Sequence, residues 1–78
     1  MNVATEFGNI SVYTSAAAAR RNAEHEMHEP ALVRFKMMGD QELFATFPKG
    51  YPLPREIKAA GGEIIQRLTM QASGYRWR

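Results

Sequence analysis

The side chains most suited to chemistry are concentrated between residues 24 and 29, in the sequence Glu-His-Glu-Met-His-Glu. His25 and His28 are three residues apart, a spacing at which two imidazoles on one helix face can share a metal ion. The zincin pattern instead requires a second histidine four residues after the first, and that position holds Glu29. The chain has only two histidines, so no third imidazole can complete a site. We therefore predict no metal site and expect a solvated helix end, where the helix dipole favours imidazole side chains.

Patterns for nucleophilic catalysis and phosphate binding are also absent from the sequence. None of Ser11, Ser15 and Ser73 is flanked as Gly-x-Ser-x-Gly, and the chain has no cysteine to act as a thiol nucleophile. The pair Gly61-Gly62 lacks the lysine and hydroxyl residue that complete a phosphate-binding loop. We therefore expect a protein that is not an enzyme, with no catalytic residues and no cofactor.

The C-terminal segment is the first candidate for a binding surface, because after Glu63 the chain holds three arginines and no acidic residue. In an extended strand, Tyr75 and Trp77 would lie on one side and the arginines between and after them on the other. Tyrosine, tryptophan and arginine are the residue types most enriched at the energetic centres of protein interfaces. The predicted partner-binding residues are Arg67, Tyr75, Arg76, Trp77 and Arg78. A purely structural interpretation stays open, in which the rings cover the core and the arginines are solvated.

The second candidate depends on an open sheet face. Tyr13 would point outward from its strand, Arg34 and Lys36 would share one face of the next hairpin, and one possible register adds Phe44. Aromatic rings beside cations on an open sheet are how RNA-recognition domains stack bases. Tyr13, Arg34, Lys36 and Phe44 therefore form a candidate site for single-stranded nucleic acid. The alternative is that Phe44 belongs to the core, and residues 43–47 do not match the RNP1 pattern of those domains.

Size and composition indicate one small globular domain spanning residues 1–78. The chain is 45% apolar and 23% charged, close to the average of globular proteins and unlike a disordered tail. Its formal charge of +2 arises in the C-terminal half. No apolar run approaches the ~18 residues of a membrane span, and the first residues do not resemble a secretory signal. We therefore expect a cytoplasmic protein without a membrane partner.

Two helices are predicted to pack on the strands. Residues 16–29 contain four consecutive alanines and follow Ser15, whose hydroxyl suits an N-cap. Pro30 ends this helix, because the residue before a proline is pushed out of the helical region. A short helix is predicted over residues 54–60, since proline suits a first helical position and Gly61 suits a helix end.

Turn signals and alternating apolar residues predict three antiparallel hairpins. The predicted strand pairs are residues 3–7 with 10–14, 31–38 with 42–48, and 63–70 with 75–78. Gly8-Asn9 marks the first turn. In the third hairpin Trp77 would lie opposite Leu68 and Tyr75 opposite Met70, all on one face. A helix with a tail over residues 63–78 stays open as the alternative.

The register of the second hairpin stays open, because two loop lengths around Gly39-Asp40 are compatible with the sequence. A two-residue loop sets Phe35 opposite Phe44. A three-residue loop sets Val33 opposite Phe47, and a slip of one residue exchanges the two faces.

Together these elements predict an α+β fold, an antiparallel sheet of four to six short strands with both helices packed on one face. The order strand, helix, strand, strand, helix, strand is that of the ferredoxin-like split βαβ unit. In that topology the strand at 10–14 would neighbour the strand at 42–48, with Tyr13 beside Phe44.

The leading functional hypothesis is a small non-enzymatic module that binds a protein partner and acts as an inhibitor or regulator by occluding the partner's surface. In size and build the chain resembles phage- and mobile-element-encoded inhibitors, anti-CRISPR proteins among them, although no motif carries a residue role across. The alternative hypothesis is a module that binds single-stranded nucleic acid on the open sheet face. A second alternative is a structural or regulatory homodimer that hides this face against its own copy.

Overall fold

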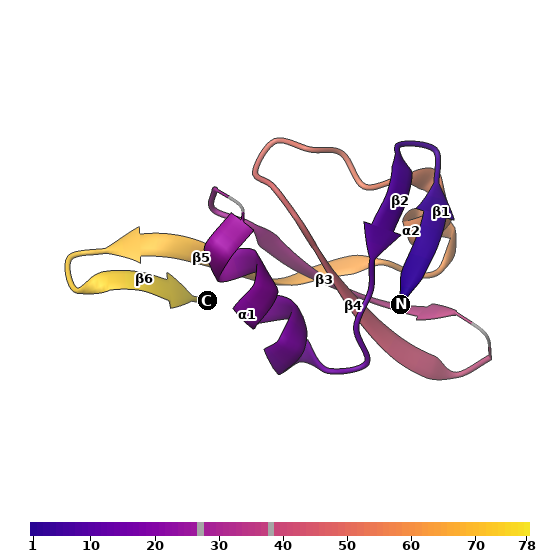
Figure 1. The fold of residues 1–78 in the computed structure, drawn as a ribbon, viewed down its shortest axis with the longest axis horizontal. Coiled ribbons are helices and arrows are strands. Elements are labelled where there is room, and N and C mark those ends of the chain that lie inside the picture. Colours follow the sequence, from indigo (N-terminus) through magenta and orange to yellow (C-terminus); the bar gives the residue numbers. More distant parts are fainter. Residues whose placement is uncertain (27, 38) are drawn as a thin grey trace.

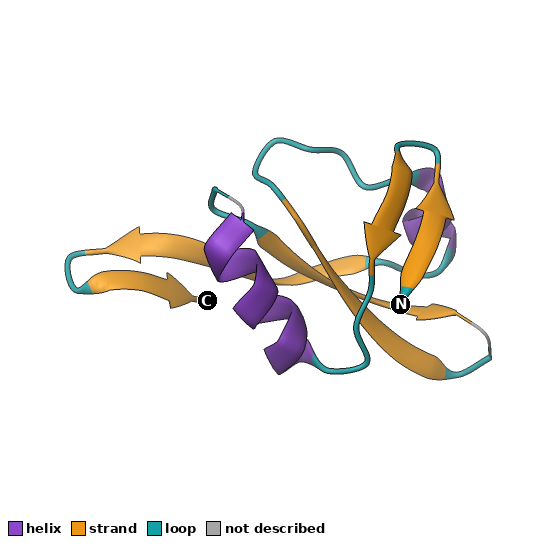
Figure 2. Cartoon of the chain, viewed as in Figure 1, coloured by secondary structure: helices purple, strands orange, loops and turns teal. Residues whose placement is uncertain are grey.

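The computed structural model describes residues 1–26, 28–37 and 39–78 and confirms the α+β class (Figures 1 and 2). Its elements in chain order are β1 (Asn2–Thr5), β2 (Gly8–Ser11), α1 (Ala16–Glu26), β3 (Ala31–Met37), β4 (Gln41–Phe47), α2 (Arg55–Ala59), β5 (Glu63–Gln71) and β6 (Gly74–Trp77). Each of the three predicted hairpins forms, as β1–β2, β3–β4 and β5–β6.

The strands form a four-stranded antiparallel sheet in the order β4-β3-β5-β6 and a separate two-stranded hairpin, β1-β2. Beyond β2 the chain meets the outer edge of β4, where Tyr13 and Phe44 exchange two backbone hydrogen bonds of 2.8 Å. This neighbourhood is the one expected for the split βαβ unit. The strand after α2 departs from that topology. In the split βαβ unit it would pair with the first strand, whereas β5 pairs with β3. The carbonyl of Ala60 accepts a hydrogen bond from the Lys36 N–H, so the chain leaves α2 already at the edge of β3.

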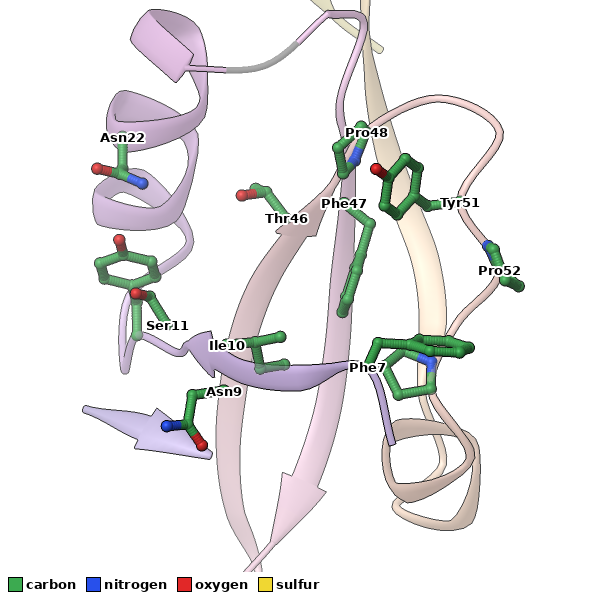
Figure 3. A pocket seen from close by; sticks show the side chains of 12 residues that line it. Phe7, Asn9, Ile10, Ser11, Asn22, Thr46, Phe47, Pro48, Tyr51 and Pro52 are labelled. Carbon is green, nitrogen blue, oxygen red and sulfur yellow. The ribbon is translucent and has the colours of Figure 1, made fainter. Parts of the chain in front are cut away.

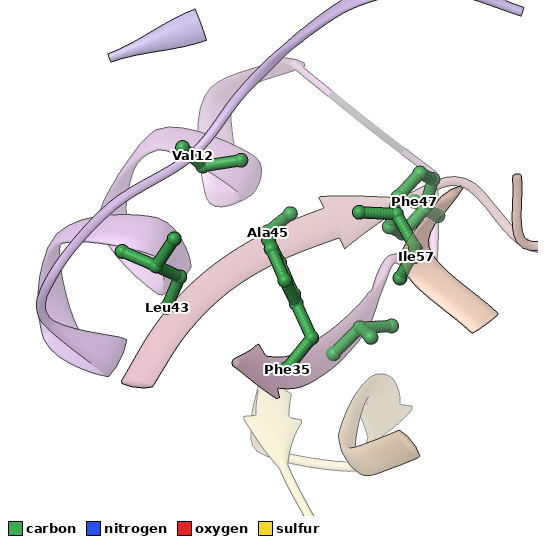
Figure 4. Close-up of a cluster of buried hydrophobic side chains, with 7 residues drawn as sticks. Val12, Phe35, Leu43, Ala45, Phe47 and Ile57 are labelled. Carbon is green, nitrogen blue, oxygen red and sulfur yellow. The ribbon is translucent and has the colours of Figure 1, made fainter. Parts of the chain in front are cut away.

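Both faces of the β3–β4 hairpin are covered, which corrects the prediction that the two helices share one face. On one face Val33 and Phe35 pack with Ile57 of α2 and with Val12, in the cluster drawn in Figure 4. On the other face Leu32 packs with Ala19 of α1 and with Phe44. Because successive side chains of a strand point to opposite faces, the buried run Ala31-Leu32-Val33 requires a cover on each side.

Helix α1 begins as predicted and ends earlier. The Ala18 N–H donates to the Ser15 hydroxyl over 3.2 Å, which confirms the N-cap. The helix ends at Glu26, whereas the prediction continued to residue 29; Met27 lies outside the described residues. Glu29 adopts a left-handed conformation with φ of 45°, and its carboxylate pairs with the Lys49 ammonium at 2.9 Å. Glu29 therefore contacts the loop after β4 instead of continuing the helix.

The turn of the first hairpin lies two residues before the predicted position. Thr5 pairs with Gly8, so the turn is formed by Glu6 and Phe7. The Thr5 hydroxyl accepts from the Phe7 N–H and donates to the Gly8 carbonyl, which closes the turn locally. Gly8 follows the turn with φ of 102°, a conformation that suits glycine, instead of occupying its first central position.

The second hairpin adopts neither of the two registers considered. Phe35 lies opposite Leu43, and Val33 lies opposite Ala45. Met37 pairs with Gln41 at the end of β3, and the predicted strand end at Met38 lies outside the described residues. The third hairpin has the predicted register, with Leu68 opposite Trp77.

The pairing of β3 with β5 contains a bulge. Leu32 lies opposite Gln66 and Val33 lies opposite Ile64, which leaves Ile65 as an extra residue on β5. Gln66 is on the α1 side of the sheet, where its amide oxygen accepts from the Arg20 guanidinium over 3.0 Å.

Replacing Phe35 with alanine should remove a large share of the free energy of unfolding. The ring is 1% exposed in the core, and Phe→Ala changes in cores cost about 3–5 kcal/mol. A chain of 78 residues has a total stability of roughly 4–12 kcal/mol. Phe7→Ala is the matched control, because this ring is 57% exposed and its loss should change stability by no more than about 0.5 kcal/mol. Urea unfolding followed by circular dichroism measures both, and equal effects would contradict this description of the core.

Candidate functional site

The β5–β6 hairpin carries all five residues predicted to bind a partner. Residues 63–67 of β5 pair with β3 inside the central sheet, and residues 68–71 pair with β6. Residues 67–78, here called the terminal hairpin, project from the body of the protein past α1 (Figure 1). The molecule measures 40 Å in its long direction and 22 and 18 Å across. The terminal hairpin is therefore an arm reaching away from the core.

One side of the terminal hairpin is apolar, and its two aromatic rings have different surroundings. Trp77 packs against the α1 cluster, and its indole N–H donates to the Glu24 carboxylate over 3.0 Å. Leu68 beneath it is buried. Farther along the arm, Met70 is 65% exposed and Tyr75 is 58% exposed. The structural interpretation therefore holds for Trp77, which fastens the arm to α1, while Tyr75 and Met70 form an exposed apolar pair.

The opposite side of the terminal hairpin is basic. Arg67 and Arg78 are direct cross-strand partners, with backbone hydrogen bonds of 2.8 and 2.9 Å, and Arg76 lies on the same side. All three side chains are exposed. The Arg78 guanidinium donates to the neutral amide of Gln71 over 3.2 Å. Ion pairs within the described residues lie elsewhere, so these three positive charges have no carboxylate partner there.

The structure places Tyr13, Phe44 and Arg34 on adjacent extended segments, as predicted for the nucleic-acid site, but it buries the ring on which stacking depended. Phe44 is buried under α1, so its ring is not available for stacking, as the core interpretation expected. Tyr13 is half-buried and packs beside the same cluster. Arg34 is ion-paired with Glu63, whose hydrogen bond raises the pKa of the guanidinium. Lys36 is exposed. Helix α1 covers this sheet face around Phe44, whereas the part of the face that carries Arg34 and Lys36 is not fully covered. The homodimer hypothesis concerned the same face.

A pocket that the sequence did not reveal lies between β2, α1, the end of β4 and the loop after it (Figure 3). Its volume is about 260 Å³. Aromatic rings from Phe7, Phe47 and Tyr51 line it, together with polar groups that include Asn9 and Ser11. None of the described lining residues is charged. Such a pocket suits a neutral, flat apolar group, but its volume is below the roughly 300–1,000 Å³ of most small-molecule sites.

A reciprocal contact holds the first turn, and with it the pocket wall at Phe7, against α2. The Glu6 N–H donates to the Glu56 carboxylate over 3.0 Å, and the Glu6 carboxylate accepts from the Arg55 N–H over 2.6 Å. Only the fold brings these residues together, since they are about fifty positions apart in the chain. The sequence held no local signal for the pocket, because its walls come from four separate segments.

The histidines do not form a recognisable metal centre. His25 is in the last turn of α1, and His28 lies beyond the end of the helix. In the described part of the chain, no three potential ligands come together around one position. Neither α1 nor α2 is long and apolar enough to cross a membrane, and the described residues contain no other helix.

Comparison with known proteins assigns no relatives to this chain, because no family model, curated protein or solved structure matches it. The candidate site is therefore argued from geometry alone, and the terminal hairpin combines exposed aromatic, apolar and basic side chains.

Acid should weaken the contact between the first turn and α2. The hydrogen bond from the Glu6 N–H is the main reason that the pKa of Glu56 lies below its ordinary value of 4.5. A lowered folded-state pKa contributes stability above the unfolded-state pKa, and this contribution is lost as the pH falls through the folded-state pKa. The difference in urea midpoint between the wild type and Glu56→Gln should therefore shrink between about pH 7 and about pH 3. A difference that stays constant over this range would contradict the assignment.

Proposed function

We propose that the protein is a binding module for a protein partner and that the terminal hairpin is its contact surface. The observation that carries the proposal is the exposed pair Met70 and Tyr75 on a projecting arm whose opposite side holds three arginines without carboxylate partners. Exposed tyrosine and methionine, with arginine nearby, have the composition of an interface centre. Tyrosine provides a large contact area at a low entropic cost, because only two of its torsions must be fixed.

Size favours this surface over the pocket. The pocket volume of about 260 Å³ is small for an organic ligand, whereas the arm exposes side chains on both of its faces. Trp77 supports the terminal hairpin, since it packs against the α1 cluster and its N–H donates to Glu24. The support limits movement of the hairpin relative to α1, so less conformational freedom is lost on binding.

The proposed mode of action is occlusion. A chain of 78 residues that contacts its partner through an arm can cover part of the partner's surface without performing chemistry of its own. The protein is in this proposal an inhibitor or regulator, the class that includes inhibitors encoded by phages and other mobile elements. Adding the purified protein to its captured partner in equal amounts should lower the partner's activity, and unchanged activity at saturation would contradict the inhibitory role.

Tyr75→Ala should reduce capture of the partner by about 10-fold or more, as expected for a residue at an interface centre. The experiment uses tagged protein to capture partners from source-cell lysate, with and without nuclease, at low and high salt. A stoichiometric protein that survives nuclease and high salt is the expected product, because apolar contacts depend little on salt. Titration of that purified partner against the variant then gives the loss in affinity.

Tyr51→Ala is the matched control, because Tyr51 is 66% exposed and lines the pocket far from the arm in sequence. It should leave capture unchanged. Loss of capture in Tyr51→Ala with full capture in Tyr75→Ala would move the site to the pocket. Recovery of nucleic acid alone, released at high salt, would overturn the proposal in favour of phosphate contacts by the arginines.

A further inference from the structure

We infer that the partner docks on the terminal hairpin as an added β-strand, through an extended segment in which acidic and apolar residues alternate. This inference rests on the proposed function and adds the way in which the partner is recognised. It depends on two independent features of β6, the direction of its backbone groups and the separation of its side chains onto two faces.

The first feature is the free edge of β6. Arg67 and Arg78 exchange two backbone hydrogen bonds, so they form a hydrogen-bonded pair of the β5–β6 ladder. Hydrogen-bonded and non-hydrogen-bonded pairs alternate along antiparallel strands. Arg76 therefore also bonds toward β5, while the N–H and C=O groups of Tyr75 and Trp77 point away from it. They face an outer edge where the described residues place no further strand.

An edge of this kind is a template for another strand, because its unpaired N–H and C=O groups lie in a row. The terminal hairpin in particular would be stabilised by an added strand. Beyond the central sheet it consists of only two strands, and two-stranded ribbons are marginally stable in water without a third strand or a helix. Its inner part is supported by α1 through Trp77, whereas Tyr75 lies farther out and exposed.

The second feature is charge, and it defines the chemistry of the added strand. Side chains of neighbouring strands lie beside each other on the same face. On one face the added residues would contact Tyr75 and Trp77, which favours apolar side chains. On the other face they would contact Arg76 and Arg78, whose charges meet no carboxylate within the described chain. Arginine binds carboxylates through paired hydrogen bonds, so acidic residues complement this face.

A second copy of the chain is a poor occupant of this edge. Pairing β6 with another β6 in antiparallel register would place the arginines of both copies on the same face. Like charges directly opposite one another destabilise a strand pair. The same arginines therefore discourage self-association along the edge and favour an acidic partner.

The test uses a capped peptide of about ten residues that alternates glutamate and valine, with a lysine–valine peptide as its matched control. Hydrogen exchange of individual backbone amides is followed by NMR. On adding the glutamate peptide, exchange at the Tyr75 and Trp77 amides should slow by about 10-fold or more, because these groups gain bonded partners. The Arg76 amide should change little, since it is already bonded to β5. The lysine peptide should leave all three amides unchanged.

Charge reversal provides a second test. In the double variant Arg76→Glu/Arg78→Glu, the affinity for the glutamate peptide should fall about 10-fold, and the affinity for the lysine peptide should rise about 10-fold. Equal binding of both peptides to the wild-type protein would overturn the role of charge. Binding without protection of the two outward amides would overturn strand addition. Concentration-dependent protection in the free protein would show that a second copy occupies the edge, and would overturn the inference as well.

These failures are distinct from failure of the proposed function. If neither peptide binds while the lysate partner still requires Tyr75, the arm remains the contact surface and strand addition is wrong. If capture of the partner is unaffected by Tyr75→Ala, the arm itself is not the surface, and both proposals fail.

Discussion

The fold depends on β3, a strand that must be covered on both faces and paired along both edges. Leu32 and Val33 point in opposite directions, and both side chains are fully buried. β4 and β5 satisfy the backbone groups on the two edges. No single helix can cover two faces of a sheet, so two separate parts of the chain are needed. The alanine side of α1 covers one face, and Val12 with Ile57 covers the other.

The distribution of exposed side chains follows from this arrangement. Toward the outer end of β3 the cover by α1 stops, and Arg34 emerges on that face beside Glu63, whereas Phe35 on the other face stays buried. At the opposite end, β5 continues beyond β3 and pairs with β6. Only the first part of that extension lies against α1, where Leu68 and Trp77 are covered. The part beyond it is not covered, which is why Tyr75 and Met70 are exposed at the end of the terminal hairpin.

Local patterns in the sequence predicted the elements well and their faces less well. Ser15 as an N-cap, the α+β class and the register of Trp77 on Leu68 all follow from short-range signals, and the structure confirms them. The errors arise where contacts between segments far apart in the sequence determine the local structure. The turn at Glu6 is held by α2, and Glu29, which was predicted to be helical, pairs with Lys49 instead. The burial of Phe44 depends on which face α1 covers, and the pocket requires four segments at once.

The bulge at Ile65 has a consequence for the whole arm. Before it, the even-numbered Ile64 shares the face of Val33, away from α1; after it, the even-numbered Gln66 shares the face of Leu32, toward α1. The extra residue thus exchanges the two series of side chains for the rest of β5. If Ile65 instead took a regular place in the ladder opposite Leu32, Arg67 would face α1 and Leu68 would lie on the opposite side. The bulge therefore determines which surface of the terminal hairpin is apolar and which is basic as seen from the body of the protein.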